Sequence, residues 1–170
     1  FCASKQKLAT GCIELNDTHA FSNLSDFPGS ISIPATNTSH ALISIYGVDY
    51  YPEMTVSEIP EIYDAGYDYL LLDFGILTDQ TSGEFLRCDQ RIVIGSLSPW
   101  KAHSYHTFFQ TYLATKKQQK CMLFLALSGE QKNIHKSIFR YPVSIQFIPF
   151  FCDPFHIGKD LFPFLQALLF

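Results

Sequence analysis

Polar side chains follow short apolar runs along the sequence. The clearest case is YDYLLLDFG at 67–75, where four apolar or aromatic residues precede Asp73 and a glycine follows it. A run without polar alternation predicts a strand that is buried on both faces, in the middle of a parallel sheet. In open α/β sheets, ligands bind at the carboxyl ends of such strands. Asp73 is therefore a candidate metal ligand, or else a cap for the turn that follows.

Other polar residues end the remaining apolar runs, so we expect them at the same edge of the sheet. The full set is Glu14, Asn16, Asp17, Asp73, Ser96, Ser98 and Asp153. Acids and hydroxyls in one crevice suit magnesium and phosphate, because Mg²⁺ takes hard oxygen ligands and keeps several waters. Solvated loops at strand ends carry the same residue types in any α/β protein. The pattern leaves both interpretations open.

The elements that would position these residues alternate along the chain. Strands are expected near 11–15, 69–73, 91–96, 121–127 and 144–149, and helices over 55–66, 82–89, 99–119, 130–140 and 159–170. This alternation predicts an α/β fold with one mostly parallel, doubly wound sheet and helices on both faces. A strand, a turn at Gly47 and a second strand are expected over 41–54. The segment 27–37 should be the least structured part.

Composition limits the classes of protein to consider. The 170 residues are 47% hydrophobic and 15% aromatic, which is enough for one core, so we expect a single domain over 1–170. A net charge of -4 with dispersed Lys and Arg argues against a nucleic-acid partner. Five cysteines without a C-x-x-C pair indicate reduced thiols, and no apolar run is long enough to span a membrane. These features predict a soluble, cytoplasmic protein without stable membrane insertion.

Two further motifs have simpler explanations than function. His103 and His106 stand three residues apart on the expected helix 99–119, but no third metal ligand is near in sequence, which favours a solvated helix edge. The final helix has only Lys159 near its start as a cationic residue, so we expect a core helix and not a membrane-surface helix.

Five motifs, taken in order, resemble the MinD/ParA class of P-loop ATPases, especially its bacterial CpaE/TadZ-like branch. They are IELND, YDYLLLDFG, RIVIGSLSPWK, CMLFLALSG and SIQFIPFFCDPFHIGKDLFPFL, and they cover nearly the whole chain. The resemblance implies a P-loop NTPase-like fold that binds ATP with Mg²⁺. It places Asp73 on the Walker B acid, which holds Mg²⁺ through water, and Glu14 on the first acid of the deviant switch segment. Pro149 and Asp153 fall where the class lines the base and ribose.

The sequence departs from the class at two points. The second switch acid is replaced by Asn16, and an amide cannot accept a proton from water, so hydrolysis is weakened unless Asp17 substitutes. No G-x-x-x-x-G-K-[ST] motif occurs, although its amides and lysine hold most of the triphosphate in this class. Because the chain begins at Phe1, we expect that loop upstream. ATP and Mg²⁺ would then bind only to the complete protein.

The resemblance also implies partners, and it leaves two alternatives open. The class forms nucleotide-sandwich homodimers, and its CpaE/TadZ branch is associated with placing pilus or secretion machinery. A non-catalytic scaffold that retains the fold would explain both Asn16 and the absent loop. A receiver domain would make Asp73 a phospho-acceptor, but it needs a lysine after the fifth strand, where SIQFIPF ends in Phe150.

Overall fold

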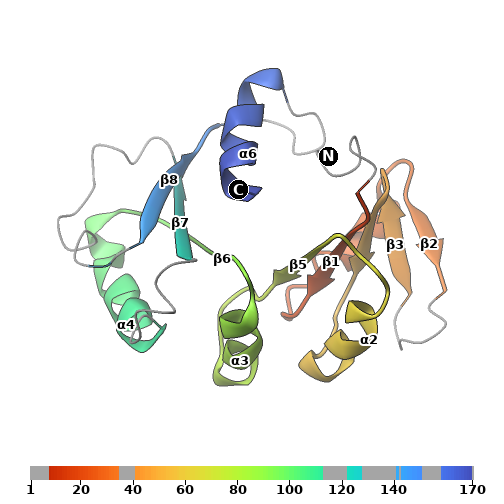
Figure 1. Ribbon diagram of the computed structural model, residues 1–170, viewed down its shortest axis with the longest axis horizontal. Coiled ribbons are helices and arrows are strands. Elements are labelled where there is room, and N and C mark those ends of the chain that lie inside the picture. Colours follow the sequence, from red (N-terminus) through yellow and green to blue (C-terminus); the bar gives the residue numbers. More distant parts are fainter. Residues whose placement is uncertain are drawn as a thin grey trace. The chain divides into compact units, whose positions relative to one another are not determined.

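The computed structural model describes residues 8–34, 41–112, 122–127, 141, 143–150 and 158–169. The chain divides into two compact units, Phe1–Phe85 and Leu86–Phe170, which are treated one at a time below. Each unit combines strands and helices (Figure 1), and four of the six strand pairs among the described residues are parallel. The expected α/β class is therefore confirmed. That both units belong to a single domain stays a prediction.

The first unit contains a five-stranded sheet in the order β2-β3-β4-β1-β5. Its strands are β1 (Thr10–Glu14), β2 (Ile31–Ile33), β3 (Leu42–Ile45), β4 (Val48–Tyr51) and β5 (Tyr69–Asp73). β1 pairs in parallel with β4 and β5, whereas β3 pairs antiparallel with β2 and β4. The hairpin between β3 and β4 turns through Tyr46 and Gly47, both with positive φ, as a two-residue turn requires.

Helical segments follow these strands in the first unit. They are the 3-10 turns η1 (Ser22–Asp26) and η2 (Val56–Glu58) and the α-helices α2 (Ile59–Tyr63) and α3 (Asp79–Arg87). Thr55 begins the helical segment that the sequence predicted over 55–66, because the Glu58 carboxylate accepts hydrogen bonds from the Thr55 N–H at 2.8 Å and hydroxyl at 2.6 Å. Ser57 lies in the middle of η2 and is not the cap.

The core of the first unit lies between the sheet and α2. Its buried members are Ile13, Leu15, Tyr51, Met54, Ile59 and Ile62. Gly11 lets the Tyr67 ring cross β1, since a Cβ there would come within 3.1 Å of that ring and 2.9 Å of Leu70 Cδ1. The Tyr67 hydroxyl then donates to Asp49 Oδ2 at 2.8 Å. This contact ties the start of β5 to β4 across β1.

The position of β5 corrects one prediction. The sequence placed 69–73 in the middle of a single sheet with 91–96, buried on both faces, but β5 is the last strand of its sheet and pairs only with β1 among the described residues. Leu70 and Leu72 pack against the core, whereas Leu71 points to the other face and is 52% exposed. An apolar run predicts a strand, but it does not reveal which elements cover each face.

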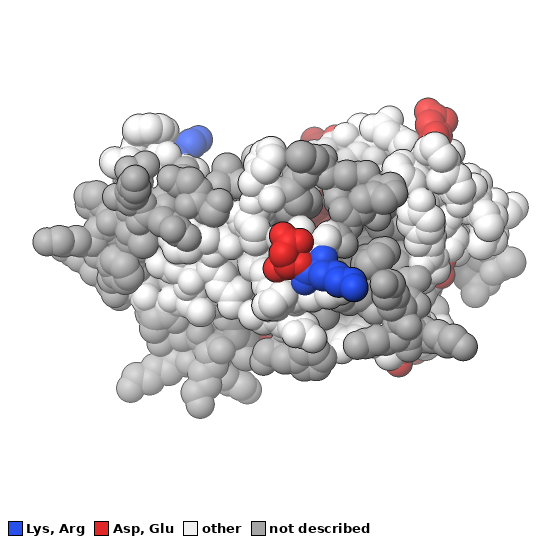
Figure 2. All heavy atoms as spheres, turned by 90° about the horizontal axis from the view of Figure 1, so that it is seen from above, with Lys and Arg blue, Asp and Glu red and all other residues white. Residues whose placement is uncertain are grey.

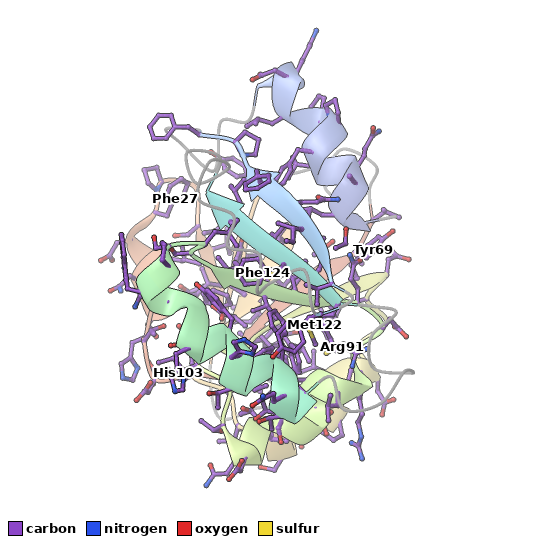
Figure 3. The ribbon with its side chains drawn as sticks, turned by 90° about the vertical axis from the view of Figure 1, so that its left-hand side faces the viewer. Phe27, Tyr69, Arg91, His103, Met122 and Phe124 are labelled. Carbon is purple, nitrogen blue, oxygen red and sulfur yellow. The ribbon has the colours of Figure 1, made fainter. Side chains whose placement is uncertain are left out.

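The second unit has a three-stranded parallel sheet in the order β6-β7-β8. Its elements are β6 (Arg91–Gly95), η3 (Pro99–Lys101), α4 (Ala102–Tyr112), β7 (Met122–Leu127), β8 (Ser144–Ile148), η6 (Lys159–Leu161) and α6 (Phe162–Leu169). Tyr105 and Phe109 of α4 place their rings 5.0 Å and 6.1 Å from that of Phe124 on β7. Figure 3 shows α4 alongside β7, with His103 on its outer side. The helix expected over 130–140 lies outside the described residues.

The two histidines of α4 do not form a metal site with other described residues. His103 is exposed, whereas the His106 ring packs edge-on against the Tyr141 ring, with a centroid distance of 5.3 Å. None of the helices among the described residues is long and apolar enough to cross a membrane. On the face shown in Figure 2, the charged side chains of the described residues are few and scattered, without a basic stripe.

The half-buried thiol of Cys12 on β1 leads to a prediction about its reactivity. Burial, with a smaller contribution from Asp49, raises its pKa from an ordinary 9.0 to about 11. At pH 8 the reactive thiolate should therefore be roughly 100-fold scarcer in the folded protein than in the unfolded chain. The rate of Cys12 alkylation, monitored by peptide mass spectrometry, should be correspondingly low in buffer and high in urea. Equal rates in both solvents would contradict this burial.

Candidate functional site

Two neighbouring strands bring the predicted site residues together. β1 and β5 pair in parallel so that Glu14 lies opposite Asp73, and the chain leaves both strands at the same edge. The Asp73 carbonyl accepts hydrogen bonds from the Leu15 N–H at 2.8 Å and from Asn16 Nδ2 at 3.1 Å. The structure therefore joins the end of β1 to the end of β5, as the sequence predicted.

The turn after β5 is shaped by Asp73 and Gly75. Asp73 is exposed, and its Oδ1 accepts a hydrogen bond from the Gly75 N–H at 2.9 Å. Gly75 has a φ of 55°, and a Cβ at this position would lie 2.8 Å from Asn16 Cβ. Glycine is thus required both by backbone conformation and by the close approach of Asn16. The carboxylate of Asp73 caps a turn, which was the simpler of its two predicted roles.

Glu14 is fully buried, and its carboxylate organises the loop after β1. Oε1 accepts hydrogen bonds from the Ala20 N–H at 2.6 Å, the Phe21 N–H at 3.3 Å and the Thr18 hydroxyl at 3.1 Å. Oε2 accepts a further one from the Glu53 N–H at 3.3 Å. A carboxylate with 0% exposure is accommodated because these donors replace its water. Glu14 holds the loop in place, and contact of Glu14 with a nucleotide stays a prediction.

A second link closes the far side of the loop. His19 Nδ1 lies 2.9 Å from Glu53 Oε1, which also accepts a hydrogen bond from the Ser22 hydroxyl at 2.8 Å. His19 and Glu53 both adopt left-handed backbone conformations, with φ of 54° and 55°. Such conformations cost free energy in residues other than glycine and persist where the surroundings fix them. No pattern in the sequence indicated this pair.

Between these segments lies an open pocket of about 600 Å³. Its lining combines amide, hydroxyl and charged groups with a few apolar side chains: Leu15, Asn16, Asp17, Thr18, His19, Glu53, Met54, Phe74, Gly75, Ile76, Thr78, Gln80 and Thr81. The lining from Thr78 to Thr81 belongs to the start of α3 and was not predicted. The feature of the sequence that could have indicated it is the polar loop after Gly75. In the structure the Thr81 hydroxyl accepts a hydrogen bond from the Thr78 N–H at 3.1 Å, and such bonds from a side chain to the backbone are common where a helix begins.

Magnesium binding by the acids of this region stays a prediction. The described residues contain no group of three or more His, Cys, Asp or Glu side chains that could enclose a metal ion. Mg²⁺ usually keeps several waters and takes only one or two carboxylates, together with substrate phosphates. Asp73 and Asp17 are both exposed, so either carboxylate can reach a hydrated ion.

The other predicted residues lie in the second unit or outside the described residues. Ser96 and Ser98 follow β6, with their hydroxyls 2.7 Å apart, and the Ser96 N–H donates to the Tyr105 hydroxyl at 2.5 Å. Pro149 follows β8 and is half-buried. Asp153 lies outside the described residues. The structure thus brings together Glu14, Asn16, Asp17 and Asp73 in the first unit.

Comparison with known proteins identifies the fold. The sequence matches no protein-family model and no curated protein. Two solved structures are similar: a ParA family ATPase from Chlorobium tepidum, with a TM-score of 0.55 and 16% identity over 99% of this chain and 80% of that chain, and the MinD cell division protein of Aquifex aeolicus, with a TM-score of 0.58 and 12% identity over 96% and 75%. At these identities the likeness concerns the fold alone. The chain therefore has the P-loop NTPase-like α/β fold of ParA and MinD.

Proposed function

We propose that this chain is part of an ATP-dependent switch of the MinD/ParA type, with nucleotide bound at the pocket between the ends of β1 and β5. The observation that carries this proposal is the hydrogen bond from Asn16 Nδ2 to the Asp73 carbonyl, which joins the candidate switch segment to the candidate Walker B strand. The 170 residues contain no glycine-rich phosphate loop. In the proposal that loop comes from sequence outside them.

Each residue of the site has a separate task in this proposal. Asp73 holds hydrated Mg²⁺, which when bound neutralises charge on the phosphates. Asn16 orients the attacking water, and Asp17 is the nearest carboxylate that could accept its proton. Glu14 keeps both residues in place through the loop that it organises. Pro149 and Asp153 are proposed to contact base and ribose, on the resemblance alone.

The biological setting is proposed on the same basis. We expect a weakly active or degenerate ATPase that dimerises with nucleotide and positions pilus, secretion or partition machinery, as in the CpaE/TadZ-like branch. Five cysteines without a C-x-x-C pair favour the cytoplasm.

Two observations favour a second candidate, a non-catalytic scaffold. The Asp73 carboxylate already caps a turn through the Gly75 N–H, and the second switch position carries an amide and not an acid. Both features are compatible with a fold that is kept for binding partners and no longer hydrolyses nucleotide.

The test is the magnesium dependence of nucleotide binding in a chain extended upstream to include its phosphate loop. A fluorescent ATP analogue should bind with an affinity that rises with Mg²⁺, and Asp73→Asn should remove most of that dependence. Asp64→Asn, at an exposed acid after α2, is the matched control and should keep it. Magnesium dependence that survives Asp73→Asn would contradict the role of Asp73, whereas a lack of nucleotide binding by the extended chain would favour the scaffold. A gain of about 80 Da on Asp73 with acetyl phosphate would instead indicate a receiver.

A further inference from the structure

The side chain of Asn16 has most of its hydrogen-bonding positions filled. Oδ1 accepts hydrogen bonds from the Thr18 N–H at 3.0 Å and from the Thr18 hydroxyl at 2.5 Å, so both of its lone pairs are used. Nδ2 donates one of its two hydrogens to the Asp73 carbonyl at 3.1 Å, and the second has no acceptor among the described residues. Because Asn16 lines the pocket, the group that it offers to a ligand there is an N–H.

The orientation of this amide is fixed by the chemistry of its partners. A backbone N–H can only donate and a carbonyl can only accept, so turning the amide over would oppose two donors at Thr18 and two acceptors at Asp73. Gly75 limits the side chain further, since a Cβ there would lie 2.8 Å from Asn16 Cβ and 3.3 Å from Asn16 Nδ2. Asn16 therefore offers the pocket a donor and not an acceptor.

The Thr18 hydroxyl connects this amide to the buried carboxylate of Glu14. It lies 3.1 Å from Glu14 Oε1 and 2.5 Å from Asn16 Oδ1, and its single hydrogen is shared between these two acceptors. Glu14 is fully buried, whereas Thr18 is exposed and lines the pocket. The hydroxyl thus links a fixed group below the pocket to the amide in its wall.

We propose that Thr18 is a positioning residue, which holds the Asn16 amide so that its second N–H donates to the oxygen of the attacking water. This inference rests on the proposed function, in which Asn16 orients that water. One lone pair of the water accepts the N–H, and the other forms the bond to the terminal phosphorus of ATP. The bond from that phosphorus to the bridging oxygen breaks, its electron pair leaves with ADP, and the proton of the water passes to Asp17.

The first test is ATP turnover by the chain extended upstream. Thr18→Val keeps the size of the side chain but removes the hydroxyl, so kcat should fall about tenfold while KM stays unchanged, because a misplaced water affects the reaction and not nucleotide binding. Thr18→Ser restores the hydroxyl and should restore kcat. The matched control is Thr107→Val, which removes an exposed hydroxyl that donates to the His103 carbonyl on α4 and should leave kcat unchanged.

A double-mutant cycle shows whether Thr18 acts through Asn16. In an Asn16→Ala background, Thr18→Val should have no further effect on kcat, because the amide that it positions has been removed. A loop that has only become less stable would lose activity in both backgrounds. An equal fall of kcat in both backgrounds, or a rise of KM at unchanged kcat, would overturn the proposal.

NMR relaxation of the 170-residue chain tests the amide without nucleotide. The Asn16 Nδ2 group should have an order parameter of about 0.85, as in a rigid backbone, and Thr18→Val should lower it toward about 0.6, whereas Thr18→Ser should not. A mobile amide in the unaltered chain, or an order parameter that Thr18→Val leaves unchanged, would overturn the proposal. An extended chain with an ordered amide and no ATP hydrolysis would overturn the proposed function, and with it the contact to water, but not the positioning of Asn16 by Thr18.

Discussion

Replacing Asn16 by Asp in the upstream-extended chain should raise ATP turnover about 100-fold. The amide at this position can orient a water but cannot take its proton, and a positioned general base contributes an effect of this order. In the unaltered protein, Asn16 Oδ1 accepts hydrogen bonds from the Thr18 N–H at 3.0 Å and from the Thr18 hydroxyl at 2.5 Å. An aspartate keeps an acceptor oxygen for both donors. It gives up the donor to the Asp73 carbonyl. The expected gain in turnover therefore comes with a small loss of thermal stability.

Two variants show whether the gain belongs to this position. Asn23→Asp adds the same charge at an exposed residue of η1 and should leave turnover unchanged. Asp17→Asn tests the alternative base. If Asp17→Asn abolishes turnover while Asn16→Asp has no effect, the assignment of the water-orienting position to Asn16 is wrong.

Removing the buried carboxylate of Glu14 should cause a large loss of stability in the first unit. Glu14→Ala leaves the N–H groups of Ala20, Phe21 and Glu53 without their acceptor. Unsatisfied buried donors cost about 1–3 kcal/mol each, and partial access of water lowers the sum, so we expect a loss of roughly 3–5 kcal/mol. For a chain of this size that corresponds to a fall in Tm of roughly 10 °C.

The control for Glu14→Ala is Asp17→Ala, which removes an exposed acid three residues away. It should change the free energy of unfolding by less than about 0.5 kcal/mol. Thermal melts followed by circular dichroism measure both variants. A Glu14→Ala protein that melts with the parent would contradict the role of Glu14 as the anchor of the loop, and so would an equal loss in Asp17→Ala.

The sequence predicted where the strands lie along the chain better than it predicted which strands pair with each other. β1, β5, β6, β7 and β8 all lie where apolar runs indicated, because a run of four or five such residues favours an extended, buried segment. Their division into two sheets was not predictable, since pairing depends on contacts between residues far apart in the chain. β2 was missed because Ile31–Ile33 is too short and too exposed to differ from a polar loop.

The candidate site was predicted in part for a similar reason. Parallel strands end at one edge of a sheet, so their order alone brought Asn16 near Asp73. The structural role of Glu14 could not be read from sequence, because its partners are backbone N–H groups of residues up to 39 positions away. Backbone donors have no sequence signature. The same holds for the contact of His19 with Glu53, which depends on two left-handed residues.

The measurement that tests the central claim most directly is calorimetry of Mg-ATP binding to two proteins, this 170-residue chain and the chain extended upstream. The phosphate loop, its lysine and its hydroxyl supply most contacts to the triphosphate in P-loop proteins, and no such motif occurs in the 170 residues. We predict that only the extended chain releases heat of binding, and that it does so only with Mg²⁺. Tight binding by the 170 residues alone, or an upstream sequence without a glycine-rich loop and lysine, would contradict the proposed function.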